Sequence, residues 1–98
     1  MSTNASGLTE ELQLWVGAQG MFFEYHTSLS KLTLKLTFIE HRRSLFVVCV
    51  DCAWISGPTR WTCGAMEVAA DGKYAIVLRD PTVQLEVRCG TVVLRSAE

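Results

Sequence analysis

Hydrophobic and polar residues alternate most regularly between Lys31 and Phe38. Every second position there is apolar, and lysine or threonine fills the positions between. A period of two is typical of a β-strand with one face in the core and the other toward water. The pattern predicts such a strand over residues 31–38. Its inward row is Leu32, Leu34, Leu36 and Phe38.

A second stretch, residues 45–55, is apolar on both alternating faces, which is typical of a strand buried on two sides. We therefore expect a central strand there. A turn over residues 56–59 should end it, because proline presets φ and removes a backbone donor. The chain then returns over residues 60–68 as an antiparallel partner, which places Trp54 opposite Trp61.

Two more reversals are expected downstream. A short loop over residues 70–72 would set Met66 opposite Ile76. Asp80-Pro81 marks the next reversal, and residues 91–94 form a last short strand. The inward row of these strands comprises Val47, Cys49, Met66, Val68, Tyr74, Ile76, Leu78, Val83, Leu85 and Val87.

The N-terminal region allows two interpretations. Residues 1–7 are expected to form a disordered tail. Residues 9–16 fit a helix with Thr9 as its cap, an acidic first turn and a short apolar stripe. The same residues also alternate as a strand, with Leu12 and Leu14 on one side. The sequence leaves both interpretations open.

Length and composition are those of one modest domain, with 98 residues, 49% of them hydrophobic and 19% charged. The predicted elements give an all-β fold over residues 8–98. It is an antiparallel meander that closes into a small β-barrel or β-sandwich, with or without a short N-terminal helix.

The second face of the central strand decides the functional hypothesis. A monomer rarely leaves a contiguous apolar patch in water, so something has to cover this face. The N-terminal segment, a second copy or another protein would serve. We therefore expect a non-enzymatic module for protein interaction or homo-oligomerisation, anchored by tryptophans. The expected interaction residues are Trp54, Trp61, Phe46, Val48 and Val50. The N-terminal residues that would cover them are Leu12, Trp15, Val16, Phe22 and Phe23.

A net charge of −1 gives no global field that would attract nucleic acid or acidic membranes. No run approaches the roughly 18 apolar residues of a membrane span. The N-terminus lacks the basic and apolar regions of a signal peptide. We expect a cytoplasmic protein that uses no cofactor.

The four cysteines offer an alternative, a structural zinc site. Cys49 and Cys52 form a C-x2-C pair, and Cys63 and Cys89 could complete the ligand set. In an unbroken strand, however, side chains three positions apart point to opposite faces, so the pair could not chelate one ion. We expect reduced, packed thiols and no metal.

No catalytic motif emerges. His26 and His41 stand apart from any serine or cysteine nucleophile. Asp51 is the one carboxylate inside an apolar strand, and we expect it to lie at a strand end or to bond a backbone amide.

A basic cluster supports a second alternative function, a β-barrel that binds a small anion or a nucleotide through a basic hairpin loop. Arginine and lysine are the side chains that recognise phosphate and carboxylate groups. The expected anion-binding residues are Lys31, Lys35, His41, Arg42 and Arg43.

Overall fold

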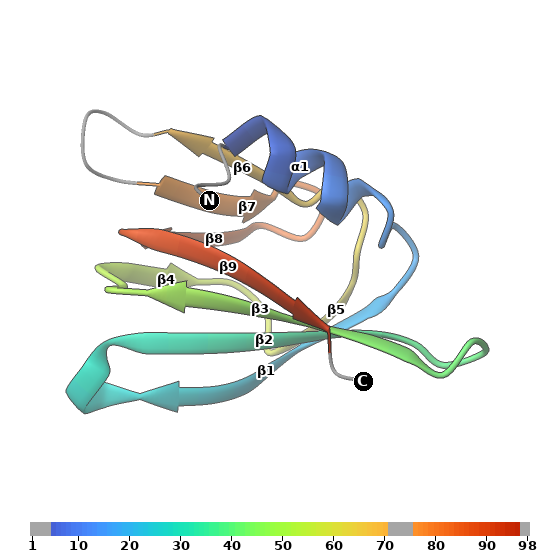
Figure 1. The fold of residues 1–98 in the computed structure, drawn as a ribbon, viewed down its shortest axis with the longest axis horizontal. Helices are drawn as coiled ribbons and strands as arrows, with labels where there is room; N and C mark the ends of the chain where they lie inside the picture. Colours follow the sequence, from blue (N-terminus) through green and yellow to red (C-terminus); the bar gives the residue numbers. More distant parts are fainter. Residues whose placement is uncertain (1–4, 71–75, 97–98) are drawn as a thin grey trace.

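Two antiparallel sheets face each other in a computed structural model that describes residues 5–70 and 76–96 (Figure 1). One sheet has five strands in the order β5-β1-β2-β3-β9, and the other has four in the order β4-β8-β7-β6. The helical elements are α1 (Ala5–Gln13) and the short 3-10 helix η1 (Thr27–Leu29). The strands are β1 (Gln19–His26), β2 (Lys31–Phe38), β3 (Arg43–Val50), β4 (Trp54–Ser56), β5 (Arg60–Thr62), β6 (Glu67–Ala70), β7 (Ile76–Asp80), β8 (Leu85–Cys89) and β9 (Thr91–Ser96).

The core lies between the two sheets, so the all-β prediction is confirmed with the sandwich as its form. Alternation explains which residues fill it. Most of the expected inward residues that the structure describes are buried, and Phe38, Ile76 and Val83 are partly buried against the core. Tyr74 lies outside the described residues, and so does the loop expected over residues 70–72 apart from Ala70.

The strand predicted over residues 31–38 is β2, and it pairs with β3 from Leu32 opposite Cys49 to Phe38 opposite Arg43. Residues 39–42 form the connecting loop, in which Arg42 adopts a left-handed backbone with φ 52°. Strand β9 pairs with the other edge of β3. It runs to Ser96 and so extends two residues beyond the predicted end.

The continuous strand expected over residues 45–55 is wrong, because β3 ends at Val50. Asp51 takes a left-handed conformation with φ 61°, which aspartate tolerates better than most residues. The chain then leaves the five-stranded sheet. The amide of Cys52 donates to the Ser30 carbonyl at 2.8 Å, and the amide of Ala53 donates to Arg88 of the other sheet at 2.7 Å.

The expected Trp54–Trp61 hairpin is also wrong. Strand β4 pairs with β8, which sets Trp54 opposite Arg88, whereas β5 pairs with β1, which sets Trp61 opposite Gly20. The turn over residues 56–59 therefore connects two sheets instead of two neighbouring strands. The fold is not one simple meander, because successive strands change sheets after β3, β4, β5 and β8.

Strands β6, β7 and β8 follow one another as a meander, with the Asp80-Pro81 reversal where it was predicted. Their register differs from the expected one. Val68 pairs with Leu78 and Ala70 with Ile76. The observed partner of Ile76, Ala70, is thus four residues further along the chain than the expected partner, Met66. The shift is even, so every side chain keeps its predicted face.

The N-terminal segment forms a helix, not a strand, and it begins at Ala5, within the range expected to be a tail. Figure 1 shows α1 lying against β6, at the edge of the four-stranded sheet. The Thr9 hydroxyl accepts a hydrogen bond from the Val68 amide at 2.9 Å and donates one to its carbonyl at 3.0 Å. The helix thus covers an edge strand whose polar groups would otherwise be open to pairing. Within the described residues, no helix has the length and apolar character that a membrane span requires.

Candidate functional site

The candidate site is the outer face, defined here as the side of the five-stranded sheet turned away from the core. Its residues are Met21, Phe23, Glu24, Lys31, Thr33, Lys35, Phe46, Val48, Val50, Val93 and Arg95. They alternate along each strand with core residues such as Leu34 and Val47. The second apolar face predicted for β3 is therefore confirmed for the residues up to Val50.

Strand pairing arranges this face in rows. One row runs across the sheet from Lys35 through Phe46 to Arg95, and the next runs from Thr33 through Val48 to Val93. Directly opposed side chains in such a row have Cβ atoms about 4.5–5.5 Å apart. Phe46 is therefore flanked by a cation on each neighbouring strand.

A β-bulge adds a second aromatic ring to the face. The pairing of β1 with β2 shifts between Phe22 and Glu24, which leaves Phe23 without an opposite residue. The Phe23 and Phe46 rings lie 5.1 Å apart, and the Lys35 ammonium stands over both, 5.5 and 5.8 Å from their centroids. This cation–π geometry holds Lys35 on the face without a carboxylate.

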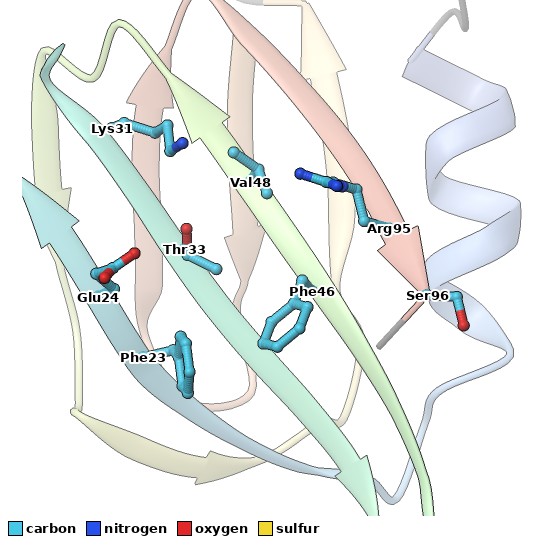
Figure 2. Close-up of a pocket in the computed structure, with 8 residues that line it drawn as sticks. All are labelled: Phe23, Glu24, Lys31, Thr33, Phe46, Val48, Arg95 and Ser96. Carbon is cyan, nitrogen blue, oxygen red and sulfur yellow. The ribbon is translucent and has the colours of Figure 1, made fainter. Parts of the chain in front are cut away.

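These side chains border a hollow of about 320 Å³, shown in Figure 2. We call it the outer-face hollow, and it is lined by Phe23, Glu24, Lys31, Thr33, Phe46, Val48, Arg95 and Ser96. Apolar side chains occupy its middle. In Figure 2 the charged ends of Lys31 and Arg95 point toward each other from opposite sides of Val48.

Positive charge is in excess around the outer-face hollow. Among the described residues, no carboxylate forms an ion pair with Lys31, Lys35 or Arg95. Glu24 borders the hollow, but its carboxylate contacts the His26 ring at 3.0 Å. The hollow therefore combines an apolar floor with cations that no described carboxylate neutralises, in a chain whose net charge is −1.

One interpretation of the sequence expected the N-terminal segment to cover this face, but it does not. Leu12 and Trp15 are buried in the core, Phe22 packs against the core, and Val16 is half-exposed. Of the expected covering residues, Phe23 alone reaches the outer face, and it is itself 49% exposed.

The expected anion-binding residues do not form one cluster. Lys31 and Lys35 belong to the outer face, but the hairpin loop is at the far end of β2. There the Arg43 guanidinium lies 5.3 Å from the Trp15 ring centroid, and the His41 ring packs edge-on against Phe38. His41 and Arg43 thus support the aromatic packing at the loop base.

The two expected tryptophan anchors, Trp54 and Trp61, lie on different sheets of the sandwich. Trp61 is buried, with its ring edge-on to Phe22 at 6.0 Å. Trp54 lies on the other sheet and is 57% exposed. Phe46, Val48 and Val50 are the predicted interaction residues that share one surface.

The four cysteines do not gather into a metal site. No group of three or more His, Cys, Asp or Glu side chains in the described part of the chain is placed to hold an ion. Cys63 lies apart, where its thiol contacts the Met66 sulfur at 3.6 Å. Burial, with a smaller effect of the Asp80 carboxylate, raises the pKa of the Cys63 thiol to about 12. A packed, protonated thiol is therefore the expected state of Cys63 at neutral pH.

The other three cysteines are neighbours where β3 and β8 end. The hydrogen bond between the Cys49 and Cys89 side chains, together with burial, raises the pKa of Cys49. The same hydrogen bond lowers the pKa of Cys89, against the opposing effect of burial. The Cys52 thiol donates to the Cys49 carbonyl at 3.3 Å, and its pKa is raised by burial. All four cysteines are free.

Asp51 lies at the end of β3, one of the two positions expected for it, and its side chain is exposed. His26 contacts Glu24 on the surface, and no cysteine or serine of the described residues bonds to its ring. No described group of side chains joins a nucleophile to a base.

The outer face contains residues that were not assigned to a binding site from the sequence, above all Arg95 and Phe23, which was expected only as a cover. A bulge has no clear sequence signature, so the outward position of Phe23 could not be anticipated. Arg95 continues the alternation of Thr91 and Val93 by one more step, and extending the last strand would have found it.

No protein-family model, curated protein or solved structure matches the chain, so its function is argued from the outer face itself.

Proposed function

We propose that this chain is a non-enzymatic interaction domain that binds a segment of another protein on its outer face. The observation that carries the proposal is the apolar row of β3, Phe46, Val48 and Val50, which points away from the core. A strand facing water in a stable monomer normally carries polar residues there, as β2 does with its lysines and threonines.

The size and openness of this surface suit a protein segment. Phe23, Val50 and Val93 are 49%, 36% and 42% exposed, so each has apolar surface left to bury. Complete burial of one such side chain contributes roughly 1.5–3 kcal/mol. Aromatic side chains at the centre of a patch are the usual source of binding energy. The Phe23–Phe46 pair holds that central position.

Charge favours a different protein over a second copy. Two copies packed face to face would bring Lys31, Lys35 and Arg95 close to the same residues of the partner. Like charges across an interface are unfavourable, and the described part of the outer face offers only Glu24 to offset them. We therefore assign the homo-oligomer second place.

The proposal is tested by selecting random peptides displayed on phage against the immobilised chain. Recovered peptides should bind the wild type and lose binding to the Phe46→Ser variant. The matched control is Ile39→Ser, since Ile39 is an apolar residue of the hairpin loop, 72% exposed and away from the outer face. In NMR spectra, bound peptides should shift the amide resonances of Phe46, Val48 and Val93.

Peptides that bind both variants equally, or that shift only resonances on other surfaces, would overturn the proposal. Sedimentation velocity over a range of concentrations tests the second copy. A dimer that dissociates in Phe46→Ser but persists in Ile39→Ser would assign the outer face to self-association instead.

A further inference from the structure

The outer-face hollow contains a specific arrangement of charge that the apolar row alone does not explain. Figure 2 shows the Lys31 ammonium and the Arg95 guanidinium approaching Val48 from opposite sides. Each comes from a strand next to β3, Lys31 from β2 and Arg95 from β9. Neither has a carboxylate partner among the described residues.

Two cations that converge without a counter-charge repel each other, and burying their surroundings would strengthen that repulsion. An anionic group between them removes it and gains charge-assisted hydrogen bonds from both. Arginine also offers a planar pair of donors that fits a carboxylate or a phosphate. The gap above Val48 is therefore suited to one anionic group.

Apolar binding surface lies directly beside this gap. Phe46 and Val48 are two positions apart on the same face of β3. The Phe23 ring lies tilted against the Phe46 ring, with the ring centroids 5.1 Å apart. A segment whose side chains alternate, with every second one turned to the sheet, would place neighbouring inward residues about 6.6–6.8 Å apart. The same spacing separates Phe46 from Val48 along β3.

We infer that the outer face recognises an acidic extended segment, with one carboxylate held between Lys31 and Arg95 and an adjacent apolar side chain on Phe23 and Phe46. The inference rests on the proposed function and names the chemistry of the partner. A free anion would use the cations and leave the aromatic pair in water. A peptide with both features uses the whole hollow.

The test uses three short capped peptides in which phenylalanine and a variable residue stand two positions apart with threonine between them, so that both face the sheet. The variable residue is glutamate, glutamine or lysine, and inorganic phosphate is a fourth ligand. Binding is followed by amide shifts of the labelled chain. The glutamate peptide should bind at Phe46 and Val48 more tightly than the glutamine peptide, and the lysine peptide should bind weakest. The affinity of the glutamate peptide should fall as the salt concentration is raised, because exposed charge pairs are screened.

Charge-removing variants locate the carboxylate. Lys31→Gln and Arg95→Gln should each weaken the glutamate peptide by about fivefold and leave the glutamine peptide unchanged. Arg42→Gln is the matched control, because it removes the same charge from the hairpin loop at the opposite end of β2. It should leave binding of both peptides unchanged. Thermal unfolding of all three variants verifies that each is folded.

The outcomes separate this inference from the proposed function. Equal binding of the glutamate and glutamine peptides at Phe46 would overturn the inference and leave the interaction domain standing. A glutamate peptide unaffected by Lys31→Gln and Arg95→Gln, or phosphate binding as tightly as the peptide, would also overturn it. If no peptide shifts the outer-face resonances and phage selection fails as well, the proposed function itself is wrong.

Discussion

Asp80 shows how a single side chain can join two connections of the sandwich. It is fully buried, and its carboxylate accepts backbone hydrogen bonds from Gly64 at 2.9 Å, Ala65 at 3.2 Å and Thr82 at 3.1 Å. The Thr82 hydroxyl donates a further bond at 2.5 Å. A buried carboxylate is tolerable when donors surround it in this way. Asp80 thereby ties the β5–β6 connection to the β7–β8 turn.

We predict that Asp80→Asn destabilises the chain by about 2 kcal/mol, because the amide group would place a donor against the Gly64 or Ala65 amide. Urea denaturation followed by tryptophan fluorescence measures this loss. Asp51→Asn is the matched control, since Asp51 is exposed and asparagine also tolerates a left-handed backbone. Equal losses in the two variants would contradict the role assigned to Asp80.

Asp80 and Asp51 also show what the sequence can reveal of single residues. The turn formed by Asp80, Pro81 and Thr82 was predicted, because an aspartate that bonds the amide two residues on is a known turn former. The left-handed Asp51 was not, because the apolar run continues on both sides of it. A local backbone conformation leaves the hydrophobic pattern unchanged.

At the scale of elements, the alternation of apolar and polar residues predicted which sheet face a residue occupies but not which residue pairs with it on the next strand. A strand pattern with a period of two is unchanged by an even shift. Ile76 could therefore lie opposite Met66 or Ala70 with the same side inward, and the loop length chooses between them. The pairing of β5 with β1 depends on long-range packing, which no local pattern contains.

That pairing relies on Gly20. A Cβ at Gly20 would overlap atoms of the Trp61 indole ring, which packs across β1. A glycine in a strand often marks such a close approach. Trp61 in turn packs edge-on against Phe22, so the contact fixes the edge strand to the sheet.

We expect Gly20→Ala to cost about 1–3 kcal/mol, the usual range for overpacking, in the free energy of unfolding measured with urea. The same substitution made in a Trp61→Leu chain should cost clearly less, because the smaller side chain leaves room for the methyl group. This double-mutant cycle isolates the contact. Similar costs in both backgrounds would mean that Gly20 is needed for its backbone and not for the ring.

At the scale of the whole molecule, the two sheets are joined near the end of β3 by more than apolar packing. The Gly90 amide donates to the Val50 carbonyl at 3.0 Å. The residues just before these two in the chain, Cys89 and Cys49, lie side by side. Their sulfurs are hydrogen-bonded. One cysteine belongs to each sheet, so a disulfide between them would cross-link the sandwich.

A small-molecule disulfide such as oxidised glutathione should therefore convert the two thiols to a Cys49–Cys89 bond and release two reduced glutathiones. The bond would raise the free energy of unfolding by up to about 4 kcal/mol for the loop it closes, and the thermal midpoint would rise with it. Peptide mapping after alkylation identifies it. Cys52→Ser should retain the cross-link and Cys89→Ser should lose it. A Cys49–Cys52 bond in the map would contradict the prediction.

The candidate site was predicted in part. The apolar outer row of β3 followed from the pattern of residues 45–50 alone. The Trp54–Trp61 pair did not form, because the prediction extended one strand through a point where the chain changes sheets. The cations were recognised, but only Lys31 and Lys35 belong to the site, since Arg95 enters it through the pairing of β9.

Strand β3 has apolar side chains on both faces, so its own pattern does not favour one hairpin register over the next. The strict row of lysines and threonines on β2, together with the short loop over residues 39–42, must set the alignment for both strands. Adding one residue to that loop would turn Phe46 and Val48 to the core in place of Val47 and Cys49, so that one apolar pair would replace another. Loop length in this hairpin is consequently under tighter constraint than loop sequence, and a folding chain has here its most probable site of misalignment.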